Sequence, residues 1–249
     1  MDLDREKDLN YLIKGIKEIK GQDCTRLYME GQERINEDIL KHIGKDTGLQ
    51  INTGENIRKK YLPIIIEKIL NLEKGNRESK EILIICHDKE KIKDLIREIS
   101  KRFGLITVFG CQGDDEEELY DYVLEEIGLS LFLPTTIEAI MGNYSIIVNY
   151  SEHKGVDISK KKKNCLVFDF GSKNITHREK GTGYITDFGF TLKKTNIGRN
   201  KWMDEVISSA AFESLLEENY TGEILFFVGN DPYSTREYIN TYIKVKGRF

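Results

Sequence analysis

The sequence predicts an α/β protein: a three-layer domain with a mostly parallel sheet, preceded by a small helical or α+β N-terminal segment. The first observation is a set of short, continuous apolar runs such as Glu81–Cys86, which are typical of strands buried on both faces. The second is that stretches with apolar residues three and four apart, typical of amphipathic helices, lie between these runs. Strands that alternate with helices at this spacing indicate parallel pairing through right-handed crossovers.

The N-terminal part, residues 1–55, is predicted to be α-rich. Apolar residues at helical spacing indicate a helix over residues 4–20 and a second helix around Ile35–Ile43. Thr25–Glu30 and Leu49–Asn52 are candidate short strands. A long helix is expected from Thr53 to about Glu73, but because Pro63 lies inside the pattern, the helix either begins near Leu62 or kinks there. The polar stretch that follows is either a domain boundary or a loop.

Residues 56–249 are predicted to form the Rossmann-like domain. Its expected strands are Glu81–Cys86, Leu105–Phe109, Leu129–Leu133, Tyr144–Asn149, Cys165–Phe170, Tyr184–Phe190 and Glu223–Val228. Its expected helices include Ile92–Phe103, Glu116–Ile127, Thr136–Met141, Met203–Glu217 and Thr235–Lys244. Each of the longer helices carries one apolar stripe, so each is expected to cover one face of a sheet.

Composition narrows the classes of partner. The chain has 249 residues, of which 39% are hydrophobic and 32% charged, with a net charge of −4. These values argue against wholesale disorder and provide no basic field for nucleic acid, so no nucleic-acid partner is expected. No apolar run is long enough to span a bilayer, and the N-terminus has no apolar signal core, so we expect a cytoplasmic protein without a membrane partner. A small-molecule ligand and a homo-oligomer are both compatible with the sequence.

In an open parallel sheet, ligands bind beyond the carboxyl ends of the strands, where helix N-termini also gather. The loops expected at that edge are Cys86–Lys89, Gly110–Asp114, Pro134–Thr136, Asn149–Ser151, Asp169–Ser172 and Gly229–Asp231. The first loop lacks the glycine pattern of dinucleotide folds, because no glycine occurs between Asn76 and Gly104. Lys89 or Lys91 could replace backbone contacts to a diphosphate, whereas Asp88 would repel one.

Two neighbouring segments resemble a known pattern. Tyr144–Asn149, followed after a basic spacer by Asn164–Ser172, is similar to the second half of the cofactor domain in methylenetetrahydrofolate dehydrogenases, shikimate dehydrogenases and glutamyl-tRNA reductases. Gly183–Phe188 resembles a further element of the folate enzymes. The resemblance implies NAD or NADP as cofactor. It places Asn149, Ser151, Asp169 and Gly171 on the nicotinamide side of the site, and His87, Asp88 and Lys89 on the phosphate side.

The departures from that pattern concern catalysis. The glycine fingerprint is absent, and Tyr11 and Lys14 are three residues apart where the folate enzymes have a Tyr-Lys pair four apart. No catalytic residue is therefore carried over. The leading hypothesis is a divergent dehydrogenase-like protein that binds a nucleotide or other anionic small molecule, with NAD(P)-dependent oxidoreduction as its activity. The alternative is a non-catalytic Rossmann-fold scaffold or regulatory protein that has lost the dinucleotide site.

Other chemistries have less support. Cys86, His87, Cys111 and His153 fall near the expected sheet edge but form no short chelating pair, so no metal site is predicted. The chain contains neither a P-loop nor a G-x-S-x-G nucleophile motif. The basic run Lys160–Lys163 is most simply a solvated loop.

Overall fold

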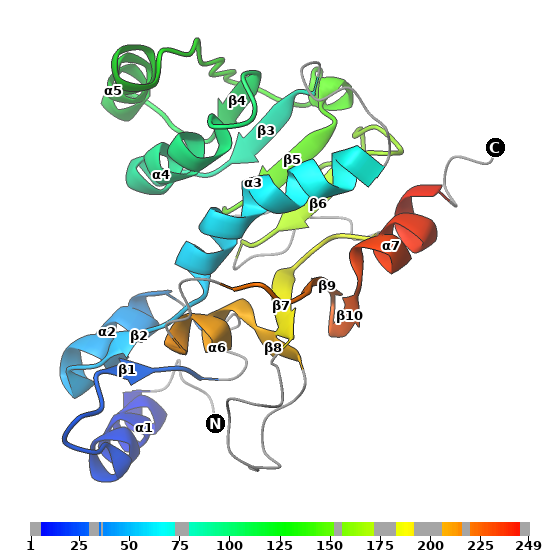
Figure 1. Cartoon of the computed structure of the whole chain (residues 1–249). Helices are drawn as coiled ribbons and strands as arrows, with labels where there is room; N and C mark the ends of the chain where they lie inside the picture. Colours follow the sequence, from blue (N-terminus) through cyan, green and yellow to red (C-terminus); the bar gives the residue numbers. More distant parts are fainter. Residues whose placement is uncertain are drawn as a thin grey trace. The chain divides into compact units, whose positions relative to one another are not determined.

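The computed structural model describes residues 6–29, 35, 37–72, 80–151, 156–171, 183–191, 206–215 and 220–244 (Figure 1). The chain divides into two compact units. The first comprises Met1–Ile57 together with Ser208–Tyr220, and the second comprises Arg58–Ile207 together with Thr221–Phe249.

The first unit is a small α/β assembly. It contains α1 (Glu6–Ile19), β1 (Arg26–Leu27), α2 (Glu37–Thr47), β2 (Gln50–Ile51) and α6 (Ser209–Ser214). The strands β1 and β2 pair in parallel, so the two short runs of the N-terminal segment form a sheet of their own. The core of this unit is made of buried aliphatic side chains that α1 and α2 supply at helical spacing, together with one residue beside β2: Ile13, Ile16, Ile43 and Leu49.

A carboxylate from α6 caps the start of a helix whose first residues belong to the same unit. Glu213 Oε2 accepts the Gly54 N–H at 2.8 Å, and its Oε1 accepts from Asn56 Nδ2 at 2.8 Å. Gly54 directly precedes α3 (Glu55–Leu72), where backbone N–H groups lack helical partners and attract negative charge. Ser208–Tyr220 is thereby tied to the N-terminal segment although it is distant in sequence.

The second unit contains the predicted parallel sheet. Its strands are β3 (Ile82–Ile85), β4 (Ile106–Phe109), β5 (Ile146–Asn149) and β6 (Leu166–Asp169), in the order β4-β3-β5-β6, and every pairing is parallel. Single bridges add Phe132 beside β4 and Ile185 beside β6. Numbered along the chain, the full order is 3-2-1-4-5-6, which is that of the doubly wound Rossmann fold. The predicted fold class is confirmed.

Three helices lie beside one another in this unit. They are α3, α4 (Lys89–Ile99) and α5 (Asp114–Tyr122), which continues as a π-helical segment, η2 (Val123–Ile127). The ion pairs Lys59–Asp94 (3.1 Å) and Arg102–Glu67 (2.8 Å) join α3 to the α4 region. The α4 stripe that covers the sheet is fully buried and consists of Ile92, Leu95, Ile96 and Ile99. Burial of each such side chain stabilises the fold by about 1.5–3 kcal/mol.

The end of the chain departs from the prediction. A second sheet has the order β10-β9-β7-β8 and is formed by β7 (Asp187–Thr191), β8 (Val206–Ser208), β9 (Ile224–Val228) and β10 (Asp231–Tyr233). In it, β9 pairs antiparallel with both β7 and β10. The prediction that Glu223–Val228 belongs to the parallel sheet is therefore wrong. Gly229, with φ +66°, begins the turn of the β9–β10 hairpin, so Gly229–Asp231 is not a loop at the carboxyl edge of the parallel sheet.

Two predicted helices near the C-terminus have different outcomes. The helix expected over Met203–Glu217 is wrong in its first part, because Val206–Ser208 forms β8 and α6 begins only at Ser209. The Ser208 hydroxyl accepts the Ala211 N–H and so sets that start. The closing helix is confirmed as α7 (Thr235–Tyr238) with the π-helical η4 (Ile239–Lys244), and a capping box from Ser234 and Glu237 starts it.

Candidate functional site

The carboxyl ends of the parallel strands are in register. Ile85 at the end of β3 is paired with Phe109 of β4 and with Asn149 of β5, which in turn is paired with Asp169 of β6. The loops that follow these strands therefore start at one level of one edge. This is the edge at which open parallel sheets bind ligands.

A chain of polar contacts crosses that edge. Asn149 Nδ2 donates to Asp169 Oδ1 at 2.8 Å, and Asn149 Oδ1 accepts the Ser151 N–H at 3.0 Å. Ser151 Oγ lies 3.3 Å from His87 Nδ1. Asn149, Ser151 and Asp169 are buried, whereas His87 is exposed. The contacts thus run from a buried carboxylate to an imidazole at the surface.

Two glycines allow these loops to approach closely. A Cβ atom on Gly171 would lie 2.4 Å from the Ser151 carbonyl oxygen and 2.8 Å from Asn149 Nδ2. Gly110 has φ +118°, and a Cβ there would lie 2.5 Å from the Cys86 carbonyl oxygen. Gly110 was expected in a loop at this edge but was given no role in the site, although a glycine directly after a strand of this sheet signals such an approach.

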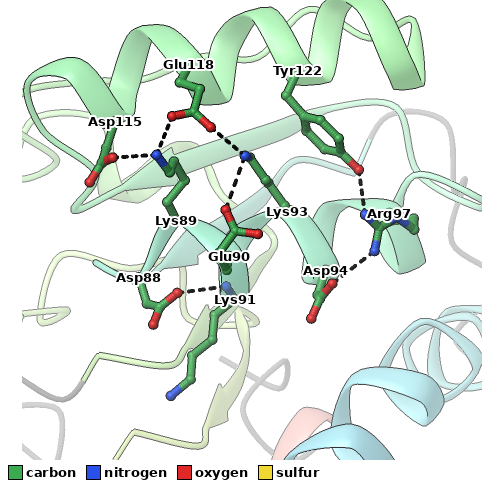
Figure 2. A network of polar contacts seen from close by, with 10 residues as sticks. All are labelled: Asp88, Lys89, Glu90, Lys91, Lys93, Asp94, Arg97, Asp115, Glu118 and Tyr122. Carbon is green, nitrogen blue, oxygen red and sulfur yellow. Dashed lines mark hydrogen bonds and ion pairs between the residues drawn. The ribbon is translucent and has the colours of Figure 1, made fainter.

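On the predicted phosphate side, the N-terminus of α4 is capped by the side chain of Asp88. Asp88 is the N-cap residue, with φ −87° and ψ 114°, and its Oδ1 accepts the Lys91 N–H at 2.9 Å (Figure 2). Helix N-termini attract anions through their unpaired N–H groups and partial positive charge. Here the Asp88 carboxylate lies at the start of α4, where a diphosphate would have to bind.

Lys89 is directed toward α5. Its Nζ lies 2.7 Å from Asp115 and also pairs with Glu118, which Lys93 contacts at 2.8 Å (Figure 2). Hydrogen bonds to Asp115 and Glu118 hold the pKa of Lys89 well above its usual value. Hydrogen bonds from Lys89 and Lys93 lower the pKa of Glu118 to about 2. These groups join α4 to α5.

The predicted site residues therefore divide into two groups. His87, Asn149, Ser151, Asp169 and Gly171 come together at the strand ends. Asp88 and Lys89 instead make the contacts of α4 with itself and with α5. His153 and Ser172 lie outside the described residues.

Acidic residues at this edge oppose the diphosphate of NAD or NADP. Asp88 carries a carboxylate at the start of α4, and the first turn of α5 carries four more acidic residues: Asp114, Asp115, Glu116 and Glu117. Like charges 4 Å apart repel by about 1 kcal/mol in water and by about 4 kcal/mol at an effective dielectric constant near 20. The nearest lysine on α4, Lys89, is already paired with acidic residues of α5.

Neither a metal centre nor a membrane span is found in the part of the chain that the structure describes. Among the described residues, no three His, Cys, Asp or Glu side chains are placed to hold a metal ion. Within the same part of the chain, every helix is too short or too polar to cross a bilayer.

No model of a known protein family matches the chain. One curated relative, the ATP-dependent RNA helicase-like protein DB10 of Nicotiana sylvestris, is 28% identical over 181 residues. The match covers 63% of this chain but 28% of that protein, so the chain is similar to a limited part of it.

Several solved structures are similar to the chain. A shikimate dehydrogenase from Aquifex aeolicus has a TM-score of 0.33 at 16% identity, covering 67% of this chain and 64% of that one. A shikimate dehydrogenase in complex with NADP+ has a TM-score of 0.34 at 15% identity, with coverage of 67% and 63%. A carbamoyltransferase-like protein from Trypanosoma cruzi has a TM-score of 0.31 at 13% identity, with coverage of 65% and 54%. The fold assignment rests on the strand order.

Proposed function

We propose that this chain is a divergent Rossmann-like protein that has lost the dinucleotide site and acts as a non-catalytic scaffold or regulatory protein. The observation that carries the proposal is the contact of Asp88 Oδ1 with the Lys91 N–H at 2.9 Å. It satisfies a backbone donor that a bound diphosphate would otherwise use, and it adds a negative charge at that point.

Two further features support the loss of this site. The loop between β3 and α4 has no glycine. Its side chains therefore occupy the space in which the backbone of a dinucleotide fold comes close to the diphosphate. In addition, the polar groups at the strand ends contact one another. Asn149 donates a hydrogen bond to Asp169 and accepts one from Ser151, so both the nitrogen and the oxygen of its side-chain amide already have partners within the protein.

A second candidate function is favoured by the same chain of contacts. A buried polar network at the carboxyl edge is where an open α/β sheet recognises a ligand, and His87 extends it to the surface. The chain would then be a dehydrogenase-like protein that binds a nucleotide or other anionic small molecule, with NAD or NADP as cofactor. Asn149, Ser151, Asp169 and Gly171 would line its nicotinamide side.

A thermal-shift panel separates the two candidates. The protein is heated with NAD+, NADH, NADP+, NADPH, a folate and ATP, the last because the curated relative is named as ATP-dependent. A ligand present at about 100 times its Kd adds about 2.7 kcal/mol of stability, which moves the melting temperature by several degrees. We expect no such shift from any of these compounds.

A concentration-dependent rise with one compound would favour the second candidate instead. Asp169→Ala then shows whether the polar contacts at the strand ends form the binding site, because this change removes the carboxylate that orients Asn149. Ligand binding that survives in Asp169→Ala would place the site elsewhere.

A further inference from the structure

We propose that the groove between α5 and the strand segment around Phe132 is a docking site for a basic segment of a partner protein. The groove is a largely open hollow of about 490 Å³. Its lining is acidic along α5 and apolar along the strand, and includes Glu116, Glu117, Tyr120, Asp121, Leu131 and Leu133. It lies at the β4 edge of the parallel sheet, where Phe132 bridges to Thr107 (Figure 1 shows α5 and β4).

The acidic residues of α5 occupy two faces of the helix. Asp115 and Glu118 face α4, where Lys89 and Lys93 neutralise them (Figure 2). Glu116, Glu117 and Asp121 line the groove, and in the described part of the chain no Lys or Arg pairs with any of the three. The groove therefore presents carboxylates whose counter-charge is not supplied by the described residues.

Helix stability accounts for only some of these carboxylates. Glu116 and Glu117 lie in the first turn of α5, where the helix dipole favours negative charge. Asp121 lies in the interior of the continuous helix formed by α5 and η2, where the helix dipole contributes little to the stability of a carboxylate. Helix stability therefore does not account for Asp121, and a positively charged partner would supply its counter-charge.

The apolar part of the groove selects the kind of partner. Leu131 and Leu133 alternate along the strand, so their side chains lie on one side of it. Leu131 is buried, so the apolar surface that a partner can reach comes from half-buried Leu133, from Tyr120, which is 39% exposed, and from Leu124, one helical turn further on, which is 49% exposed. A segment with an aliphatic or aromatic side chain between lysines or arginines would cover these groups, and its cations could also pack on the tyrosine ring.

The strand edge offers backbone groups as well. Phe132 uses its carbonyl oxygen to accept the Val108 N–H at 3.0 Å. The flanking Leu131 and Leu133 direct their N–H and C=O groups to the outer side of this strand, and no backbone hydrogen bond between described residues uses them. An extended partner segment can therefore add along this edge.

A peptide titration tests the proposal independently of nucleotide binding. The probe is a fluorescein-labelled peptide of sequence KRLKFKR, and the comparison peptide KRSKSKR has the same charge without apolar side chains. Fluorescence anisotropy should show saturable binding of the probe to the whole chain. We expect the serine peptide to bind about tenfold more weakly, because the leucine and phenylalanine lose their contacts with Tyr120 and Leu133.

Charge-reversal variants locate the site. Glu116→Lys/Glu117→Lys should weaken probe binding by about tenfold, whereas the matched pair Glu125→Lys/Glu126→Lys, outside the groove lining, should change it by less than about twofold. Asp121→Lys serves as a second test, because Asp121 is exposed within the helix formed by α5 and η2, so the change should leave the fold intact. Equal weakening by both double variants, equal binding of both peptides, or no saturable binding to the wild-type chain would overturn the proposal.

Discussion

Asp88 and Lys91 are joined by a hydrogen bond from the Lys91 backbone N–H to Asp88 Oδ1, at 2.9 Å, across the first turn of α4. The helix that follows the first strand of a Rossmann fold directs its N-terminus at the ligand edge. A carboxylate in this position stabilises the helix and at the same time opposes the approach of phosphate. Under the proposed function, this one residue links the stability of α4 to the loss of a dinucleotide site.

Two variants separate the role of Asp88 as the N-cap of α4 from its negative charge. Asp88→Ala should lower the free energy of unfolding by about 1 kcal/mol, because the Lys91 N–H loses its acceptor. Asp88→Asn should change it little, because asparagine is an equally good N-cap residue. Urea denaturation of both variants provides the measurement. Equal stability of Asp88→Ala and the wild-type chain would show that the contact does not cap α4.

The buried part of the polar network at the strand ends should contribute more to stability than its exposed end at His87. Asn149→Ala removes a donor from Asp169 and an acceptor from the Ser151 N–H, both in a buried region. An unsatisfied buried polar group costs about 1–3 kcal/mol, so this variant should lose at least that much. Ser151→Ala removes the 3.3 Å contact with exposed His87 and should lose less. The reverse order in urea denaturation would contradict this arrangement of contacts.

Gly171 tests how closely the loops after β5 and β6 approach each other. A Cβ there would lie 2.4 Å from the Ser151 carbonyl oxygen, so Gly171→Ala must push the two loops apart. We expect a loss of about 1–3 kcal/mol, which is typical of overpacking. Gly104→Ala is the matched control, because no atom lies within 4 Å of its added Cβ. Equal melting temperatures of these two variants would mean that the loops are further apart than described.

The contacts between α4 and α5 should give the protein a specific sensitivity to acid. Hydrogen bonds from Lys89 and Lys93 lower the pKa of Glu118 from 4.5 to about 2. A carboxylate with a depressed folded-state pKa contributes stability above its unfolded-state pKa, and this contribution is lost as the pH falls through the folded-state value. The wild-type chain should therefore lose stability between about pH 4.5 and pH 2, and Glu118→Gln should lose less over that range. Parallel pH profiles of the two proteins would contradict the pairing.

The parallel sheet could be predicted because its strands have a distinctive composition. Ile82–Ile85 and Ile146–Asn149 are buried along their whole length, so each appears in the sequence as an uninterrupted apolar run. Helices with a single apolar stripe separate them, and that alternation implies parallel pairing. The carboxyl edge follows from the same reasoning, which is why Asn149 and Asp169 could be proposed as neighbours.

The second sheet could not be predicted by this reasoning. Ile224–Val228 is as apolar as a parallel strand, but apolarity does not encode strand direction, and here a tight turn at Gly229 returns the chain antiparallel. Val206 and Ile207 also match a helical spacing with the residues that follow, yet they lie in β8. β-branched residues suit a strand, and the Ser208 cap starts the helix only after them.

The role of Lys89 depended on distances that the sequence does not contain. Asp115 and Glu118 are 26 and 29 residues further along the chain, and only the packing of α4 against α5 brings them to Lys89. A lysine at the start of a helix near the ligand edge is equally compatible with a phosphate contact and with such an ion pair. The sequence therefore left both roles open.

The most direct test concerns the N-terminus of α4 itself. ADP-ribose carries the diphosphate of a dinucleotide without its redox chemistry, and isothermal titration calorimetry measures its binding to the wild-type chain and to Asp88→Asn. We expect no saturable heat from the wild-type chain up to about 1 mM, because the Asp88 carboxylate holds the position of the diphosphate. Saturable binding to the wild-type chain with a Kd below about 100 µM, unchanged in Asp88→Asn, would contradict the loss of the dinucleotide site.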